Sequence, residues 1–290
     1  MSYADPLFDE VPDRRDRHSL KWGKYKDRDI LPLWVADMDF RSPPEVIETA
    51  KEAADHGNYG YGKPSPDLPE VVVDRMEKFY GWEIEPNWIV WLPGMVCGFN
   101  AACRSCGQPG DEVLSAIPVY PPFLSAPGNF GQELVQVPLA LEEDRYEMDF
   151  DALETATTER SKTFLFCHPH NPVGTIFSRP ELERFAEYCL RHELVACSDE
   201  IHCDLLLEED STHLPLAAVS PEIAEKTITL MAPSKTFNLP GFGCSFAIIP
   251  NSDLRIKYKK SCAGIVPDPP AMSFTLAETA YLHGEPWRQR

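Results

Sequence analysis

The sequence predicts an α/β fold, in which a mostly parallel sheet is covered by helices on both faces. Six short segments are near-continuous apolar runs, a pattern typical of strands that are buried on both faces. Amphipathic segments with helical spacing fill most of the gaps between them, as the crossover connections of a parallel sheet require. With 290 residues, of which 43% are hydrophobic and 25% charged, the chain can bury a sizeable core.

The predicted elements begin after an arm of 45 residues in which Pro, Asp and Arg dominate and little periodicity is present. A helix over 45–56 follows Ser42-Pro43-Pro44, which supplies a cap and a proline in the first turn. A second helix over 66–79 has an apolar face that includes Val72 and Met76. The remaining predicted elements are an apolar stretch over 88–92, strands over 112–117, 133–137, 163–167, 194–198, 227–231 and 243–249, and helices over 96–106, 149–157 and 179–192.

The net charge is −19, from 27 basic and 46 acidic residues. A surface this acidic opposes binding to nucleic acid or to an anionic membrane, because both need basic groups that replace counterions. No apolar run approaches the length of a membrane span, and residues 1–6 lack the basic and apolar regions of a signal peptide. We therefore predict a cytoplasmic protein.

The nine cysteines are too few for a disulfide scaffold, and several lie inside apolar runs, so we expect reduced thiols. Cys103 and Cys106 have the spacing of a metal or redox pair. No second pair follows at zinc-site spacing, and the surrounding residues predict a helix. We therefore interpret the two cysteines as helical neighbours and predict no metal site.

Three polar side chains follow three consecutive predicted strands: Asn171 follows 163–167, Asp199 follows 194–198, and Lys235 follows 227–231. Ligands bind at the carboxyl ends of the strands in open sheets of this kind. An amide, a carboxylate and an amine are thus expected at one edge of the sheet.

These groups predict a site for pyridoxal 5′-phosphate. The cofactor's aldehyde needs a lysine for a Schiff base, its pyridine nitrogen needs an acid, and its phenolic oxygen needs a hydrogen-bond donor. Lys235, Asp199 and Asn171 supply these in turn. Gly94-Met95-Val96 opens a helix whose N-terminus suits the phosphate, and Tyr120 is expected to cover one face of the ring.

Each group has another interpretation when it is taken alone. Lys235 is compatible with a surface loop, Asp199 with a solvated strand end, Asn171 with a turn before proline, and Gly94 with a tight bend. Their joint placement on successive strand ends favours the cofactor site.

The chain resembles fold-type I pyridoxal phosphate enzymes of the class I/II aminotransferase superfamily. The motifs that carry this resemblance are Asn171-Pro-Val-Gly174, Ser198-Asp-Glu-Ile-His202 and Ser234-Lys-Thr-Phe-Asn-Leu-Pro-Gly241. Within the superfamily, Leu33-Trp-Val-Ala-Asp-Met-Asp-Phe40, Tyr59-Gly-Tyr61 and the histidine at 202 resemble the MalY/PatB cystathionine β-lyase group. Ordinary aminotransferases usually carry tyrosine at the position of His202. The resemblance runs from about Phe8 to the last residue.

The resemblance implies a three-layer aminotransferase-like fold and a role for each matching residue. It makes Lys235 the Schiff-base lysine and the base for the Cα proton, while Asp199 pairs with the pyridine nitrogen. The other implied cofactor-binding residues are Asn171, Tyr120, Met95, Val96, Ser234 and His202, with Tyr61 from the partner subunit of a homodimer. The implied substrate pocket contains Ala36, Asp37 and Phe40.

The resemblance also implies a domain division and two departures from the family pattern. Residues 1–45 form an N-terminal arm, 46–282 the cofactor-binding large domain, and 283–290 the start of an interdomain helix, so the rest of the small domain, with its substrate-binding arginine, is expected to be missing. The family's phosphate-binding serine and arginine positions are occupied by Ala232 and Gly243, which makes the phosphate site less cationic.

The activity implied by the resemblance is β-elimination of a sulfur-containing amino acid, such as cystathionine, to pyruvate, ammonia and a thiol. An aminotransferase is the enzyme alternative, because the lysine, the acid and the ring serve both reactions. A third possibility is a truncated, catalytically impaired remnant that still binds the cofactor.

Overall fold

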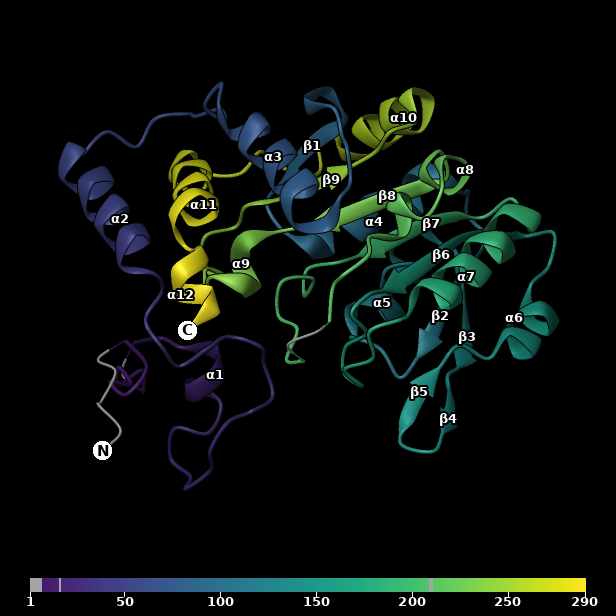
Figure 1. The fold of residues 1–290 in the computed structure, drawn as a ribbon, viewed down its shortest axis with the longest axis horizontal. Coiled ribbons are helices and arrows are strands. Elements are labelled where there is room, and N and C mark those ends of the chain that lie inside the picture. The colour runs from purple at the N-terminus through teal and green to yellow at the C-terminus, as the bar shows by residue number, and fades with distance from the viewer. Residues whose placement is uncertain (1–6, 16, 209–210) are drawn as a thin grey trace.

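The structure is a computed structural model, and it describes residues 7–15, 17–208 and 211–290. Residues 1–6, which bear on the prediction that no signal peptide is present, lie outside the described residues. Within the described ranges, one sheet has seven strands in the order β1-β9-β8-β7-β6-β2-β3 (Figure 1). These strands are β1 (Ile89–Leu92), β2 (Glu112–Ile117), β3 (Glu133–Pro138), β6 (Ser161–Cys167), β7 (Val195–Asp199), β8 (Thr227–Met231) and β9 (Ser245–Ile248).

The sheet is mostly parallel, as the sequence predicts. β9 runs antiparallel to its neighbours β1 and β8, whereas the pairs from β8 through β7, β6 and β2 to β3 are parallel. A separate hairpin of β4 (Ala140–Glu142) and β5 (Arg145–Glu147) projects from the end of the sheet near β3 (Figure 1).

Helices cover both faces of this sheet, which confirms the predicted layered fold. One face packs against α4 and α10, and the other against α6, α7 and α8 at one end and α3 and α11 at the other. The helices are α1 (Leu20–Gly23), α2 (Pro44–His56), α3 (Leu68–Tyr80), α4 (Met95–Cys106), α5 (Pro122–Ser125), α6 (Phe150–Ala156), α7 (Arg179–Arg191), α8 (Pro221–Ala224), α9 (Pro233–Thr236), α10 (Ser252–Cys262), α11 (Ala271–His283) and α12 (Glu285–Gln289).

The central strands are apolar throughout because both of their faces are buried. On β6, Phe164 and Phe166 point toward the α7 face, while Leu165 and Cys167 point toward the α4 face. Successive side chains of a strand alternate between faces, so a strand that is covered on both sides needs apolar residues at every position.

Among its described residues, 7–15 and 17–43, the N-terminal segment is irregular apart from α1, in keeping with its lack of periodicity. The predicted domain boundary after residue 45 falls inside α2, which packs on α11 through a hydrogen bond between Thr49 and Thr279. At the other predicted boundary, α11 ends at His283 and α12 follows as a separate short helix. The division into arm, large domain and interdomain helix stays a prediction.

Two general features of the described residues bear on the sequence interpretation. All nine cysteines have free thiols, and Cys103 and Cys106 are helical neighbours in α4. Among the described helices, none has the length and apolar character that a transmembrane span needs.

Candidate functional site

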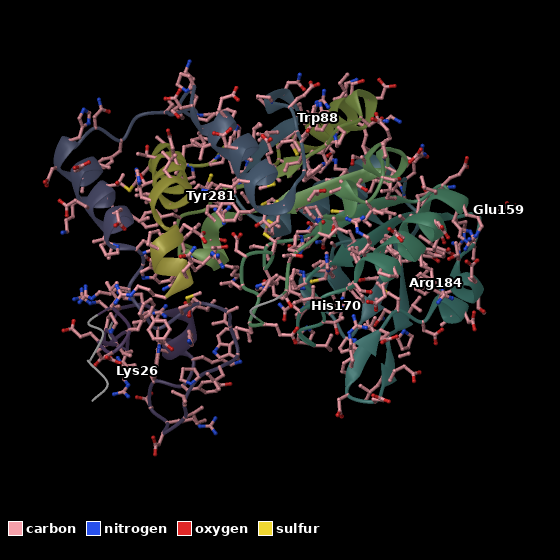
Figure 2. The ribbon with its side chains drawn as sticks, in the orientation of Figure 1. Lys26, Trp88, Glu159, His170, Arg184 and Tyr281 are labelled. Carbon is pink, nitrogen blue, oxygen red and sulfur yellow. The ribbon has the colours of Figure 1, made fainter. Side chains whose placement is uncertain are left out.

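A cavity of about 940 Å³ lies at the carboxyl ends of the central strands. The ends of β6, β7 and β8 face the side of the molecule where the N-terminal segment lies (Figure 1), and His170, just after β6, lies near this edge (Figure 2). Nine of the predicted site residues line the cavity: Ala36, Met95, Val96, Tyr120, Asn171, Asp199, His202, Ser234 and Lys235. Segments that are far apart in the sequence thus meet around one space.

Lys235 enters this cavity from a short helix at the end of β8. β8 is fully buried, and the chain turns at Ala232 into α9, which carries Lys235 in its first turn. The Nζ atom donates a hydrogen bond of 2.6 Å to the carbonyl oxygen of Ala36. Burial lowers the pKa of Lys235, against the opposing charges of Asp37 and Asp199. A lysine amine with a lowered pKa is more readily neutral, and the neutral amine is the form that attacks a carbonyl group.

Asp199 ends β7 inside the protein, where only 5% of its surface is exposed. Its Oδ1 accepts a hydrogen bond of 3.2 Å from the backbone N–H of Ile201. Burial raises the pKa of Asp199 to about 7; the Glu200 charge acts in the same direction, while the Ile201 hydrogen bond and Lys235 oppose it. A cation beside a buried carboxyl with a raised pKa would stabilise its ionised form.

Asn171, Tyr120 and His202 complete the polar side of the cavity. The backbone N–H of Asn171 donates to the Cys167 sulfur at 3.4 Å, which holds the loop after β6 against the strand. Burial, followed by the charge of Asp199, raises the pKa of Tyr120. Burial and the nearby Lys235 lower the pKa of His202 to about 4, so its imidazole is neutral at pH 7.

The N-terminus of α4 forms another wall. Met95 and Val96 occupy the first turn of this twelve-residue helix, where backbone N–H groups have no partner within the helix. The position that a Cβ would occupy at Gly94 is open, with no atom within 4 Å. At Gly243 a Cβ would instead lie 2.3 Å from the Pro93 carbonyl oxygen, so the backbone just before β9 approaches this turn closely. The close approach explains why glycine occupies this position.

Three predicted residues do not line the cavity. The carboxylate of Asp37 is held by Arg14 at 2.6 Å. The ring of Phe40 packs edge-on against Phe8, with 5.2 Å between centroids. Phe40 therefore does not line the cavity in this structure, and its place in the substrate pocket stays a prediction. Tyr61 is fully exposed and is not one of the residues that line the cavity of this chain.

The structure adds residues that the sequence analysis did not select. These are Leu20, Leu33, Cys97 and Ile201. Trp34, which begins the segment over 34–40 that the resemblance assigns to the substrate pocket, lines the cavity as well. Ile201 lies between Asp199 and His202, and Cys97 directly follows Val96 in α4. Both could therefore have been predicted from their neighbours in the sequence. Leu20 lies in the arm, where no periodicity marks which side chains face inward.

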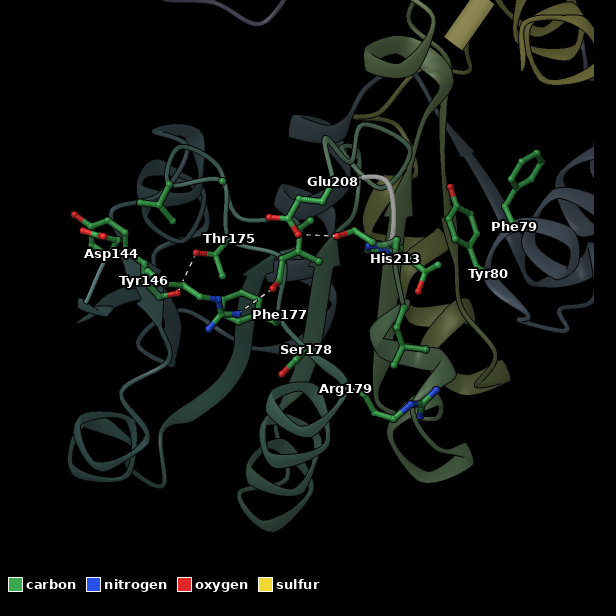
Figure 3. Close-up of a pocket in the computed structure, with 17 residues that line it drawn as sticks. Phe79, Tyr80, Asp144, Tyr146, Thr175, Phe177, Ser178, Arg179, Glu208 and His213 are labelled. Atoms are coloured by element: carbon green, nitrogen blue, oxygen red, sulfur yellow. Dashed lines mark hydrogen bonds between the residues drawn. The ribbon is translucent and has the colours of Figure 1, made fainter. Parts of the chain in front are cut away.

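A second cavity, of about 840 Å³, lies beside Tyr80, Phe177 and His213 (Figure 3). Its lining includes none of the predicted site residues. The Nε2 of His213 lies 2.7 Å from Oε2 of Glu200, the residue after Asp199. The buried Glu200 carboxylate also accepts hydrogen bonds from the Ser198 hydroxyl and the Leu216 N–H, which anchors the chain just beyond β7.

Comparisons with known proteins identify the family. A family model for class I and II aminotransferases matches residues 28–268. The cystathionine β-lyase PatB of Bacillus subtilis (strain 168) is 38% identical to this chain, over 97% of this chain and 74% of that protein.

Two solved structures have closely similar folds. A crystal structure of OvoB superposes with a TM-score of 0.94 and 45% identity, over 97% of this chain and 74% of that one. Cystalysin from Treponema denticola, which contains a pyridoxal 5′-phosphate cofactor, superposes with a TM-score of 0.92 and 34% identity, over 97% and 73%. Because the family model matches most of the sequence and PatB is similar over nearly all of it, this chain belongs to the class I and II aminotransferase family.

Proposed function

We propose that this chain is a pyridoxal 5′-phosphate-dependent carbon–sulfur β-lyase. It would take a sulfur-containing amino acid such as cystathionine, break the bond between Cβ and sulfur, and with one water yield pyruvate, ammonia and a free thiol. The observation that carries this proposal is the meeting of Lys235, Asp199 and Asn171 in one cavity. The similarity to PatB, a cystathionine β-lyase, supports the lyase outcome.

The residues present fit the cofactor. Asp199 is a buried carboxyl whose pKa burial raises to about 7 against the opposing charge of Lys235, so a further cation beside it would be stabilised. A protonated pyridine nitrogen would supply that cation and lower the pKa of Asp199. Asn171 would bind the phenolic oxygen, and Tyr120 would cover one face of the ring. When bound, the cofactor supplies an electron sink that stabilises negative charge on the substrate's Cα.

The phosphate would bind at the N-terminus of α4, near Met95, Val96 and Ser234. Partial positive charge and free N–H groups at a helix N-terminus favour an anion. The open space at Gly94 lets a phosphate approach the backbone there. The family's arginine position is Gly243 here, so this site depends more on backbone donors than on side-chain charge.

Lys235 would bind the cofactor as an amine and then move the substrate's proton. Its neutral form accepts the Cα proton, and its protonated form can donate a proton later in the reaction. His202, neutral at pH 7, would lie beside Lys235 without adding a positive charge. Ala36 would form part of the substrate wall, since its carbonyl oxygen already contacts the Lys235 amine.

The proposal includes a homodimer in the cytoplasm. Leu20 and Leu33 line the cavity, yet they are 71% and 81% exposed on the isolated chain, which suits a surface that a second subunit covers. The exposed Tyr61 would then reach the phosphate site of the partner subunit. Free thiols at all nine cysteines of the described chain suit a reducing compartment.

A direct assay separates the lyase from an aminotransferase. Purified protein is mixed with pyridoxal 5′-phosphate, cystathionine and 2-oxoglutarate, and pyruvate, free thiol and glutamate are measured. Equal amounts of pyruvate and thiol are the expected result. Conversion of 2-oxoglutarate to glutamate without pyruvate would assign an aminotransferase instead. A protein that binds the cofactor but forms neither product would retain only the binding function.

A further inference from the structure

Asn238 joins the Lys235 turn to the segment over 36–40, whose first residue, Ala36, lines the cavity. It lies three residues after Lys235, and its backbone has a positive φ of 55°, a conformation that asparagine tolerates better than most residues. Its Oδ1 accepts a hydrogen bond of 3.0 Å from the N–H of Met38. Its Nδ2 donates to the carbonyl oxygens of Met38 at 3.3 Å and Phe40 at 2.9 Å.

The other side of this segment is held by two basic residues of the arm. Arg14 bonds the Asp37 carboxylate at 2.6 and 3.1 Å and the Met38 carbonyl oxygen at 3.1 Å. Lys21, buried to 4% exposure, bonds the Asp37 carbonyl oxygen at 2.9 Å and the Asp39 carboxylate at 2.7 Å. The arm therefore fixes 37–39 to itself, while Asn238 fixes the same backbone to the Lys235 turn.

These hydrogen bonds fix the position of Ala36 relative to the Lys235 amine. Ala36, which lines the cavity, directly precedes the held residues, and its carbonyl oxygen accepts the hydrogen bond from the Lys235 Nζ. The segment has no regular secondary structure of its own, so its position depends on these side-chain bonds. Asn238 itself does not line the cavity.

We propose that Asn238 is a positioning residue of the enzyme: its amide side chain holds the backbone of segment 36–40, and through it keeps Ala36, which lines the cavity, in place opposite Lys235. This inference rests on the proposed function, because a positioning role requires that a substrate binds in the cavity beside Ala36. Loss of the amide should release the segment while leaving Lys235 able to bind the cofactor, since the hydrogen bonds of the Asn238 side chain go to Met38 and Phe40 and not to the amine or Asp199.

Two substitutions test the proposal. Asn238→Gly keeps a residue that adopts positive φ freely but removes all three side-chain bonds. Asn238→Asp keeps the shape and the acceptor for Met38 but replaces the Nδ2 donor with an oxygen that faces two carbonyl oxygens. The control is Glu143→Gly, a second non-glycine residue of positive φ (51°), in the exposed turn between β4 and β5.

Hydrogen exchange of the cofactor-free full chain is the first measurement. Both Asn238 variants should exchange the amides of 36–40 at least about tenfold faster than wild type, as expected for the loss of two or three hydrogen bonds. The rest of the chain and the control should be unchanged. Unchanged exchange at 36–40 in both variants, or an equal increase throughout the chain, would overturn the proposal. This measurement does not depend on which reaction the enzyme catalyses.

Steady-state kinetics of the cofactor-loaded enzyme is the second measurement. The variants should raise KM for cystathionine about tenfold and change kcat less, because a loosened wall weakens substrate binding. The absorption band of the bound cofactor should stay the same. An unchanged KM, or loss of the cofactor band, would contradict a positioning role. If wild type itself makes no pyruvate, the proposed function fails, while the exchange result still decides the structural role of Asn238.

Discussion

The amine of Lys235 and the carbonyl oxygen of Ala36 form a 2.6 Å hydrogen bond across 199 positions of sequence. The bond joins the turn after β8 to the irregular N-terminal segment. It also brings the Asp37 side chain, next in the chain, close enough for its charge to act on Lys235. The protonation of the lysine is therefore set by the arm as well as by the sheet.

Asp37→Asn should shift the pH dependence of cofactor uptake to lower pH. The Asp37 carboxylate raises the pKa of Lys235, so its removal lowers that pKa and leaves more neutral amine at a given pH. We expect the midpoint of the uptake rate against pH to move to lower pH. Stopped-flow absorbance after mixing with pyridoxal 5′-phosphate measures it.

Asp39→Asn is the matched control for this shift. Asp39 belongs to the same cluster and bonds Lys21 at 2.7 Å and the Trp22 indole N–H at 2.8 Å, but it is not among the charges that act on Lys235. Equal shifts in both variants would show that loosening of the cluster, rather than the charge of Asp37, sets the lysine pKa.

Asp199→Asn should stabilise the cofactor-free protein at high pH. The pKa of Asp199 rises from its ordinary value of 3.8 to about 7, mainly through burial, so the folded protein holds a proton that the unfolded chain has released. Stability therefore falls as pH rises through this window, by up to about 4 kcal/mol. His202, whose pKa falls from 6.5 to about 4, has the opposite effect between those values, so the difference between variant and wild type is the informative quantity.

Urea unfolding of both cofactor-free proteins at pH 4 and pH 8 measures this effect. The variant should match wild type at pH 4 and exceed its unfolding free energy at pH 8, and it should bind the cofactor more weakly. Asp74→Asn, at an exposed position on α3, is the control. Parallel pH dependences in wild type and Asp199→Asn would mean that Asp199 is ionised in the folded protein across this range.

Gly243→Ala should disturb the N-terminus of α4. The added Cβ would lie 2.3 Å from the Pro93 carbonyl oxygen, so the turn before Gly94 must move. We expect a loss of about 1–3 kcal/mol in stability, with weaker cofactor binding. Thermal unfolding and cofactor titration measure both. Gly241→Ala, where the Cβ would meet nothing within 4 Å, should change neither, and identical behaviour of the two variants would contradict the close approach.

The sequence predicted the sheet well because its strands are buried on both faces. The predicted strands 112–117 and 227–231 have the same bounds as β2 and β8. α11 was not predicted, since it is apolar around much of its circumference and packs against α2, α3 and α9, so no single stripe marks it. The β4 and β5 strands have three residues each, too few for an alternating pattern to be recognised.

The site was predictable to the extent that it depends on strand ends. Asn171, Asp199 and Lys235 lie in one cavity because the carboxyl ends of parallel strands meet at one edge. The arm was harder to predict. The pairing of Arg14 with Asp37 and the packing of Phe40 against Phe8 depend on tertiary contacts in an irregular segment, where no period relates sequence position to side-chain direction.

The central claim is that Lys235 is the amine that binds pyridoxal 5′-phosphate. Protein loaded with the cofactor is reduced with borohydride, digested, and analysed by mass spectrometry for the peptide that carries the reduced cofactor. We predict one cofactor on Lys235 in wild type and none on the Lys235→Ala variant. A cofactor fixed to another lysine in wild type, or retained by the variant at the same level, would contradict the assignment.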